Sequence, residues 1–172
     1  MDDQGGYPED SETHLKIFIG ADHRGFELKN KIAALLSIQN YEVVDVGTFE
    51  AQPPCDYPKI SYEVAHRVAE TKNARGILVC MTGIGHSIAA NKVPGAYAAL
   101  CYNKEAALLS REHNNANILV LGTKFVSPQK MLSIIDIWLK TEFAGGRHLR
   151  RVRQIKQIEN KFMKKNKKIQ FR

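Results

Sequence analysis

A cysteine stands at the end of an apolar run and directly before a glycine-rich turn, in the segment Gly76–Lys92 (GILVCMTGIGHSIAANK). The run Ile77–Cys80 is partly β-branched, which is typical of a buried parallel strand. Gly83 and Gly85 allow backbone conformations that a Cβ would block, and the residues after them have helical composition. We expect backbone N–H groups to point out of this turn, where they could stabilise a phosphate or an oxyanion formed in a reaction. Cys80 would stand beside that anion site.

The same segment has a plainer interpretation. Most cysteines at the ends of core strands are inert buried thiols, and the segment alone does not decide whether Cys80 is one of them. The choice depends on which other residues the fold brings to this turn.

The elements that must position the turn alternate between apolar runs of strand length and segments with helical period. We expect strands at 15–20, 41–46, 76–80, 97–101 and 117–121, and helices at 26–38, 59–71, 87–92, 104–111 and 128–143. Strands separated by helices require parallel crossover connections. The sequence therefore predicts an α/β protein, a three-layer α/β/α sandwich with a five-stranded parallel, Rossmann-like sheet and an extended C-terminal helix.

Polar residues follow the expected strands at the points where the strands end. Asp22 and His23 come after the first strand, the cysteine turn after the third, Asn103 after the fourth, and Gly122 with Thr123 after the fifth. Ligands of open parallel sheets bind outside the carboxyl ends of the strands. The clustering of polar residues there is the pattern of a functional site.

Length and composition fit one globular domain of 172 residues, with 44% hydrophobic and 25% charged residues. No apolar run approaches the roughly 20 residues of a membrane span, and the first residues lack the pattern of a secretory leader. The three cysteines, Cys55, Cys80 and Cys101, have no C-x-x-C spacing. We expect neither a disulfide framework nor a zinc site, and we expect a cytoplasmic, reducing location.

The net charge of +7 is concentrated at the C-terminal end of the chain. Residues 147–172 contain 11 Lys and Arg against one acid, Glu159, whereas the rest of the chain contains 14 basic and 17 acidic residues. A basic segment can bind nucleic acid or an anionic membrane. It shows no regular alternation of basic and aromatic residues and no nucleic-acid motif, so a solvated helical face is the favoured interpretation and no membrane partner is expected.

Six motifs, taken together, resemble the type B ribose-5-phosphate isomerases of the ribose/galactose isomerase superfamily, in its cysteine-containing subgroup. They occur in the order and spacing of that family between about residues 15 and 158, and they are Gly20-Ala-Asp-His-Arg-Gly-Phe26, Asp56-Tyr-Pro58, Cys80-Met-Thr-Gly-Ile-Gly85, Ala89-Ala-Asn-Lys92, Ser110-Arg-Glu-His-Asn-Asn-Ala116 and Gly145-Gly-Arg-His148. Each motif alone is weak evidence. The resemblance implies interconversion of D-ribose 5-phosphate and D-ribulose 5-phosphate in the non-oxidative pentose phosphate pathway, with no metal and no cofactor.

The resemblance also implies the roles of individual residues. Cys80 would move the proton between C2 and C1 of the sugar, Thr82 would relay a proton between O1 and O2, and His113 would open the sugar ring. An isolated histidine at a helix end is more often a local hydrogen-bonding residue, and an isolated Asp after a strand is often a helix N-cap. The substrate-binding residues implied are Asp22, His23, Met81, Gly83, Ile84, Gly85, Asn114, Arg147 and Arg151, with the backbone amides of Met81 to Gly85 holding the oxyanion.

The phosphate group needs cationic partners, and Arg147 with Arg151 are spaced to share one face if the segment after Gly146 is helical. A solvated basic face is the alternative. By the same resemblance the active sites lie between two subunits, so we expect a homodimer, which could assemble further. The expected organisation is a disordered acidic leader at 1–14, an isomerase domain at 15–158 and a basic tail at 159–172.

Some positions depart from the family pattern. His86 stands where another subgroup has a glutamate, and it could either tune the Cys80 thiolate or point into solvent, the second being the favoured interpretation. Tyr97 and Lys124 stand where many relatives have arginine. Two alternatives stay open. A slightly deeper pocket would suit a six-carbon sugar phosphate such as allose 6-phosphate, and a non-catalytic relative could bind anions or nucleic acid through the basic tail.

Overall fold

The structure is a computed structural model that describes residues 15–166; the expected leader at 1–14 and the end of the basic tail at 167–172 lie outside the described residues. The strands are β1 Lys16–Ala21, β2 Glu42–Gly47, β3 Ala74–Cys80, β4 Ala98–Leu100 and β5 Ile118–Gly122. The helices are α1 Phe26–Ile38, α2 Tyr57–Glu70, α3 Ile84–Ala90, α4 Lys104–Asn114, α5 Pro128–Lys140 and α6 Gly146–Asn166. Strands and helices alternate along the chain up to α5, as the sequence predicts.

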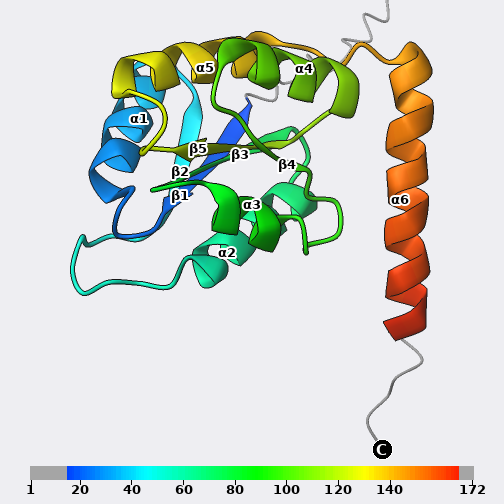
Figure 1. Ribbon diagram of the computed structural model, residues 1–172, viewed down its shortest axis with the longest axis horizontal. Helices are drawn as coiled ribbons and strands as arrows, with labels where there is room; N and C mark the ends of the chain where they lie inside the picture. The colour runs from blue at the N-terminus through cyan, green and yellow to red at the C-terminus, as the bar shows by residue number, and fades with distance from the viewer. Residues whose placement is uncertain (1–14, 167–172) are drawn as a thin grey trace, which may run out of the picture.

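The five strands form one parallel sheet in the order β2-β1-β3-β5-β4. Figure 1 shows α1, α4 and α5 over one face of this sheet and α2 with α3 over the other, while α6 stands apart from the layers. The predicted three-layer α/β/α sandwich with a five-stranded parallel sheet and an extended C-terminal helix is confirmed. None of the helices in the described part of the chain has the length and hydropathy that a membrane span requires.

Two apolar cores hold the layers together, one on each face of the sheet. Alternate residues of each strand point to opposite faces, so Ile17 and Ile19 enter one core while Phe18 enters the other. Trp138 of α5 is fully buried in the first core, and Val64 of α2 is fully buried in the second. The central strands are buried on both faces, which is why they read as continuous apolar runs in the sequence.

β1 pairs with β2 on one side and with β3 on the other, so the order in which strands are added to the sheet reverses direction at β1. In open parallel sheets such a switch leaves a crevice at the carboxyl ends of the two strands, because the connecting helices go to opposite faces. Asp22 follows β1 and Cys80 ends β3. The fold thus brings the residues after these two strands to a place where ligands commonly bind.

Several element boundaries differ from those expected. α2 begins at Tyr57, before the expected residue 59, because Pro58 in the first turn fits the helix start. α3 begins at Ile84, directly after Gly83, whose left-handed backbone ends the turn earlier than composition suggested. α5 ends at Lys140 and not at 143, because residue Thr141 is extended.

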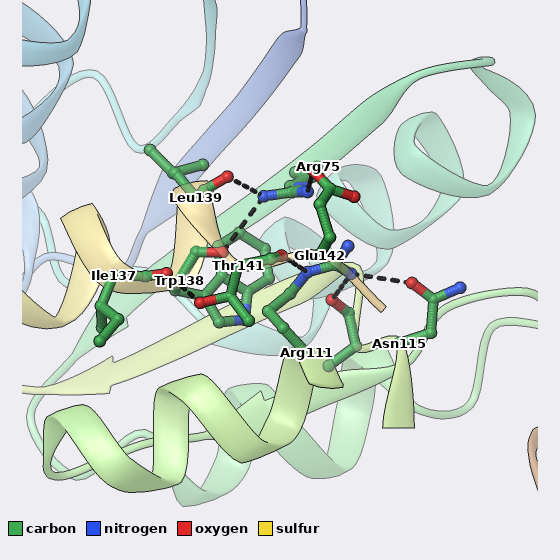
Figure 2. Close-up of polar contacts among 9 residues, drawn as sticks. Arg75, Arg111, Asn115, Ile137, Trp138, Leu139, Thr141 and Glu142 are labelled. Carbon is green, nitrogen blue, oxygen red and sulfur yellow. Dashed lines mark hydrogen bonds and ion pairs between the residues drawn. The ribbon is translucent and has the colours of Figure 1, made fainter. Parts of the chain in front are cut away.

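The end of α5 is held by two buried arginines from different layers (Figure 2). Arg75 of β3 donates to the carbonyl oxygens of Trp138 and Leu139, and Arg111 of α4 donates to that of Thr141 at 3.2 Å. Both guanidinium groups lie over the Trp138 ring, at 5.4 and 5.7 Å from its centroid. The carbonyls that end a helix carry partial negative charge, so this pair of cations stabilises the C-terminus of α5.

α6 leaves this anchored point through two glycines. Gly145 and Gly146 have φ of +64° and +51°, and a Cβ built on either would meet nothing within 4 Å. α6 then continues unbroken past residue 158 to Asn166, so the expected basic tail begins within a helix. Glu159 accepts a hydrogen bond from the backbone N–H of Gly95 at 3.0 Å, which links α6 to the loop before β4.

Replacing Arg111 with Met tests the role of the arginine pair. Arg111 also donates to the Ala116 carbonyl at 2.6 Å and to Asn115 Oδ1 at 3.1 Å, so Arg111→Met leaves several buried acceptors without their charged donor. We expect a loss of about 2–3 kcal/mol in the free energy of unfolding. Urea denaturation followed by circular dichroism measures it.

Arg67→Met is the matched control, because the Arg67 side chain is exposed and its contact with Glu63 at 3.8 Å is a surface ion pair. Its loss should change the unfolding free energy by less than about 1 kcal/mol. Equal stability of the two variants would contradict the stabilising role of the arginine pair.

Candidate active site

Cys80 ends β3 at the carboxyl edge of the sheet and is 6% exposed. The backbone N–H of Gly83 donates to its sulfur at 3.0 Å. Two bonds from the segment after β5 hold the turn in place, from Thr123 N–H to the Cys80 carbonyl at 2.9 Å and from Lys124 N–H to the Met81 carbonyl at 2.8 Å. The predicted amide turn around the sulfur is therefore present and is braced by the neighbouring strand.

Burial raises the pKa of the Cys80 thiol above its ordinary value. The backbone N–H groups of Gly83 and Thr82 act in the opposite direction, whereas the negative charge of Asp22 adds to the increase. Desolvation of the charged form therefore outweighs the effect of the two backbone amides. The thiol is the resting form of this side chain.

The conformation of the turn depends on two glycines. Gly83 has φ of +82°, and a Cβ there would lie 2.3 Å from Leu100 Cδ1. A Cβ on Gly85 would lie 2.6 Å from the Tyr57 ring. Both positions therefore require glycine. Gly83 is required for its backbone conformation and for space, and Gly85 is required for space alone.

The outer side of the turn is open to a ligand. Met81 and Ile84 are 38% and 51% exposed. Thr82 is half-buried; its carbonyl accepts from the Tyr102 hydroxyl at 3.0 Å, and its Oγ1 accepts from the Ile84 N–H at 3.4 Å. The Thr82 side chain is therefore held by its own turn, within two residues of the sulfur.

Asp22 and His23 lie after β1, beside the cysteine turn. Asp22 is 8% exposed, and its Oδ1 accepts from the N–H groups of Arg24 at 3.0 Å and Gly25 at 3.1 Å. This is the local capping role that the residue type suggests, and it leaves Oδ2 outside these bonds. His23 Nδ1 accepts from the backbone N–H of Cys55 at 3.3 Å.

His86 is completely buried in the first turn of α3, so the expectation that it points into solvent is wrong. Its Nδ1 lies 2.6 Å from Ser61 Oγ, and its ring packs edge-on against Tyr57 at 5.7 Å. Burial lowers the pKa of His86 to about 4, a decrease that the charge of Asp22 only partly opposes. The imidazole is neutral at physiological pH.

Asp22, Cys80 and His86 converge. One carboxylate oxygen, the sulfur and one ring nitrogen lie within 4.8 Å of one another. Three such atoms at this spacing could bind a metal ion, and within residues 15–166 this is the group of side chains that meets the condition. The sequence alone did not reveal this convergence, because Asp22 comes from a segment separate from that of Cys80 and His86 and because His86 was expected to point into solvent. A histidine directly after Gly85, on a short helix that must pack on the sheet, is the signal that could have revealed it.

The remaining predicted residues form a second group elsewhere. His113 at the end of α4 stacks on His148 of α6 with ring centroids 4.0 Å apart, and Arg147 Nε donates to His148 Nε2 at 3.3 Å. Burial lowers the pKa of His148 from its ordinary value, and the neighbouring Arg147 and Arg151 act in the same direction.

Arg147, Arg151 and Asn114 are exposed, and the two arginines lie four residues apart on α6, as expected. In the part of the chain that the structure describes, neither arginine makes an ion pair with a carboxylate. Two unpaired guanidinium groups on one helical face, beside two histidines, are suited to binding an anion.

The two groups lie at opposite edges of the sheet. Asn103 follows β4 at the carboxyl edge and caps α4, which then runs back over roughly 16 Å at 1.5 Å per residue. At its far end Ala116 and Asn117 lead into the start of β5, where the Asn117 N–H donates to the carbonyl of Tyr97, just before β4. The Ala144 N–H donates to the Glu112 carbonyl at 3.0 Å, and this bond joins the residues before α6 to the last turn of α4. One chain therefore does not bring His113 and Arg147 to its own Cys80.

Comparison with known proteins agrees with this fold. A sequence model of the ribose/galactose isomerase family matches residues 17–155, and the chain belongs to that family. Ribose-5-phosphate isomerase B of Escherichia coli is 43% identical over 146 residues, which cover 85% of this chain and 97% of that protein. The resemblance carried by the six motifs is confirmed.

Two solved structures are similar along nearly their whole length. A ribose-5-phosphate isomerase B from Clostridium thermocellum is 51% identical, with a TM-score of 0.82 over 86% of this chain and 99% of that chain. The ribose-5-phosphate isomerase B of Mycoplasma genitalium, solved with bound ribulose-5-phosphate, is 41% identical, with a TM-score of 0.82 over 84% of this chain and 96% of that chain.

Gly83→Ala tests how the turn is specified. The substitution imposes left-handed strain of about 1–2 kcal/mol and also forces a Cβ into Leu100, so we expect a total loss of about 3 kcal/mol or more in unfolding free energy. Gly95→Ala is the matched control, because Gly95 has φ of +83° but the nearest side-chain atom to its Cβ is 3.4 Å away. Urea denaturation of both variants separates strain from collision, and equal losses would show that Leu100 moves aside at little cost.

Proposed function

We propose that this protein is an aldose–ketose isomerase that interconverts D-ribose 5-phosphate and D-ribulose 5-phosphate, in the non-oxidative pentose phosphate pathway. The observation that carries the proposal is the Cys80 turn, a thiol held against backbone amides at the carboxyl edge of the sheet, in a chain of the ribose/galactose isomerase family. The Mycoplasma genitalium relative binds the ketose of this pair.

The reaction needs a base that removes the C2 proton, donors that stabilise the enediolate, and return of the proton to C1. Cys80 is the proposed base and proton carrier. Because its pKa is raised in the free protein, the sulfur must release its proton to solvent as substrate binds, and the Gly83 and Thr82 amides that favour the thiolate support this step. The amides from Met81 to Gly85 would then hold the oxyanion, each donor being worth about 3 kcal/mol in comparable sites. Thr82 would pass a proton between O1 and O2.

Ring opening and phosphate binding are assigned to the second group. His113 would act on the closed sugar as general acid or base, since imidazole titrates near neutral pH. Arg147 and Arg151 would bind the phosphate, together with His23 from the cysteine side. Asn114 and Asp22 would contact sugar hydroxyls. The substrate must therefore touch residues from both edges of the sheet.

A homodimer with shared active sites satisfies this requirement, because the carboxyl edge of one chain can face the α4–α6 corner of another. The exposed face of α6 supports the proposal. Ile155, Ile158 and Phe162 are 43%, 55% and 65% exposed and are spaced three and four residues apart, so they form one apolar stripe. A partner chain would cover such a stripe, and twofold dimers are the commonest closed oligomers.

We also propose a cytoplasmic location. Cys55, Cys80 and Cys101 are all free thiols. A chain that needs a reduced thiol for its chemistry fits a reducing compartment.

Turnover by the purified protein tests the proposed reaction. We expect isomerisation of ribose 5-phosphate to exceed that of allose 6-phosphate, and we expect Cys80→Ala to lose nearly all turnover while still binding the sugar phosphate. Near-normal turnover by Cys80→Ala would remove the cysteine from the base role. Faster turnover of allose 6-phosphate would assign the six-carbon substrate, and salt-sensitive RNA binding without turnover would assign a non-catalytic relative.

Mixing two inactive variants tests the shared site. If Cys80 of one chain works with His113 of the other, a mixed dimer of Cys80→Ala and His113→Ala chains contains one intact site. Random exchange of subunits should therefore restore about a quarter of wild-type activity. Denaturing and refolding each variant alone is the control. No gain above the two separate variants would show that the site is built within one chain or that His113 is dispensable.

A further inference from the structure

The convergence of Asp22, Cys80 and His86 has the character of a ligand set. The side chains offer an oxygen, a sulfur and a nitrogen within 4.8 Å of one another, and their residues are 8%, 6% and 0% exposed. Clusters of potential ligands on protein surfaces are common and consist mostly of carboxylates. This cluster is buried and combines three donor types.

Hydrogen bonds identify which nitrogen of His86 is available. The Ser61 hydroxyl donates its single proton to the Tyr57 carbonyl at 2.8 Å, so its oxygen must accept from His86 Nδ1, 2.6 Å away. Nδ1 therefore carries the proton and Nε2 carries a lone pair. Nε2 is one of the buried polar atoms in the described residues that have no hydrogen-bond partner. An unsatisfied buried lone pair is costly and calls for a ligand.

We propose that Asp22, Cys80 and His86 bind Zn²⁺ or a similar thiophilic divalent cation. Thiolate, neutral imidazole and carboxylate are all ligands of zinc, and three protein ligands leave a fourth position for water. A second hydrogen bond that fixes the tautomer of the ligating histidine, as Ser61 does here, is typical of such sites. Hard cations such as Mg²⁺ prefer oxygen ligands and should not bind.

The geometry requires a modest adjustment. Zinc lies about 2.0–2.3 Å from its ligands, so the three donors must approach one another by up to about 1 Å. Asp22 keeps its two backbone donors on Oδ1 while Oδ2 turns to the metal. On binding, the Cys80 thiol releases its proton to solvent and a sulfur–zinc bond forms.

Binding would inhibit the enzyme, because a sulfur that holds zinc cannot take the C2 proton of the sugar. This consequence rests on the proposed isomerase function, whereas the metal site itself does not. The protein would then respond to thiophilic metals through its own catalytic thiol.

Cobalt spectroscopy of the full chain, purified without a polyhistidine tag, tests the site independently of catalysis. Co²⁺ titration should produce a thiolate-to-cobalt charge-transfer band and the intense visible bands of tetrahedral coordination, both abolished by an equivalent of Zn²⁺ and not produced or displaced by Mg²⁺. Cys80→Ser should abolish the charge-transfer band. Circular dichroism checks that each variant is folded.

Histidine variants provide the matched comparison. His86→Gln should weaken Zn²⁺ binding more than tenfold, measured by competition with a chromophoric chelator, whereas His66→Gln, on the exposed face of α2, should not. Ser61→Ala keeps all three ligands and should weaken binding by about 10- to 100-fold through loss of orientation. Absence of the charge-transfer band, its persistence in Cys80→Ser, or unchanged affinity in His86→Gln would overturn the site.

Enzyme kinetics test the proposed inhibition separately from metal binding. Zn²⁺ should inhibit ribose 5-phosphate turnover competitively, and His86→Gln should be less sensitive relative to its own zinc-free rate. Zinc binding at the three residues without inhibition of an active enzyme would overturn the blocking role. If the purified protein shows no turnover at all, the isomerase proposal fails and the cobalt spectra still decide the metal site.

Discussion

All five strands run in one direction, and this constraint decides where chemistry can occur in the molecule. Every strand ends at the same edge, so the residues after β1 and β3 meet there, and each helix between two strands must return the chain to the other edge. The residues of α4 and α6 that resemble substrate-binding groups are therefore carried away from Cys80 by the same topology that builds the cysteine turn. In such a fold, a substrate that needs both sets of residues makes association of subunits part of the catalytic apparatus.

Burial shifts the pKa values of two neighbouring side chains, Cys80 and His86, in opposite directions. It raises the pKa of the Cys80 thiol and lowers the pKa of His86, so both side chains are neutral although each could be charged. A neutral thiol beside a neutral imidazole does not attract anions before the sugar arrives. It does offer soft lone pairs, which is the property that the proposed metal site would use.

The sequence predicts the architecture well because strand and helix periods are strong here, and α1 is predicted to the residue. It predicts the turn around Cys80 because glycines and a preceding apolar strand are local signals. It fails for His86, whose burial depends on Ser61 and Tyr57 of α2, residues about 25 positions away. It also does not reveal that His113 and Cys80 lie at opposite edges, since motif order along a chain carries no information on distance.

The two glycines at the start of α6 help to set the direction of that helix through their backbone torsion. Gly145 and Gly146 are left-handed but surrounded by open space, while the arginines of β3 and α4 hold the preceding helix end rigidly. The angle of α6 is therefore left to backbone torsion and to its contacts with the rest of the chain, the His113–His148 stack and the Gly95–Glu159 hydrogen bond. A substitution that changed φ at Gly145 or Gly146 would therefore move Arg147 and Arg151 of α6 relative to the sheet without any change at the sulfur.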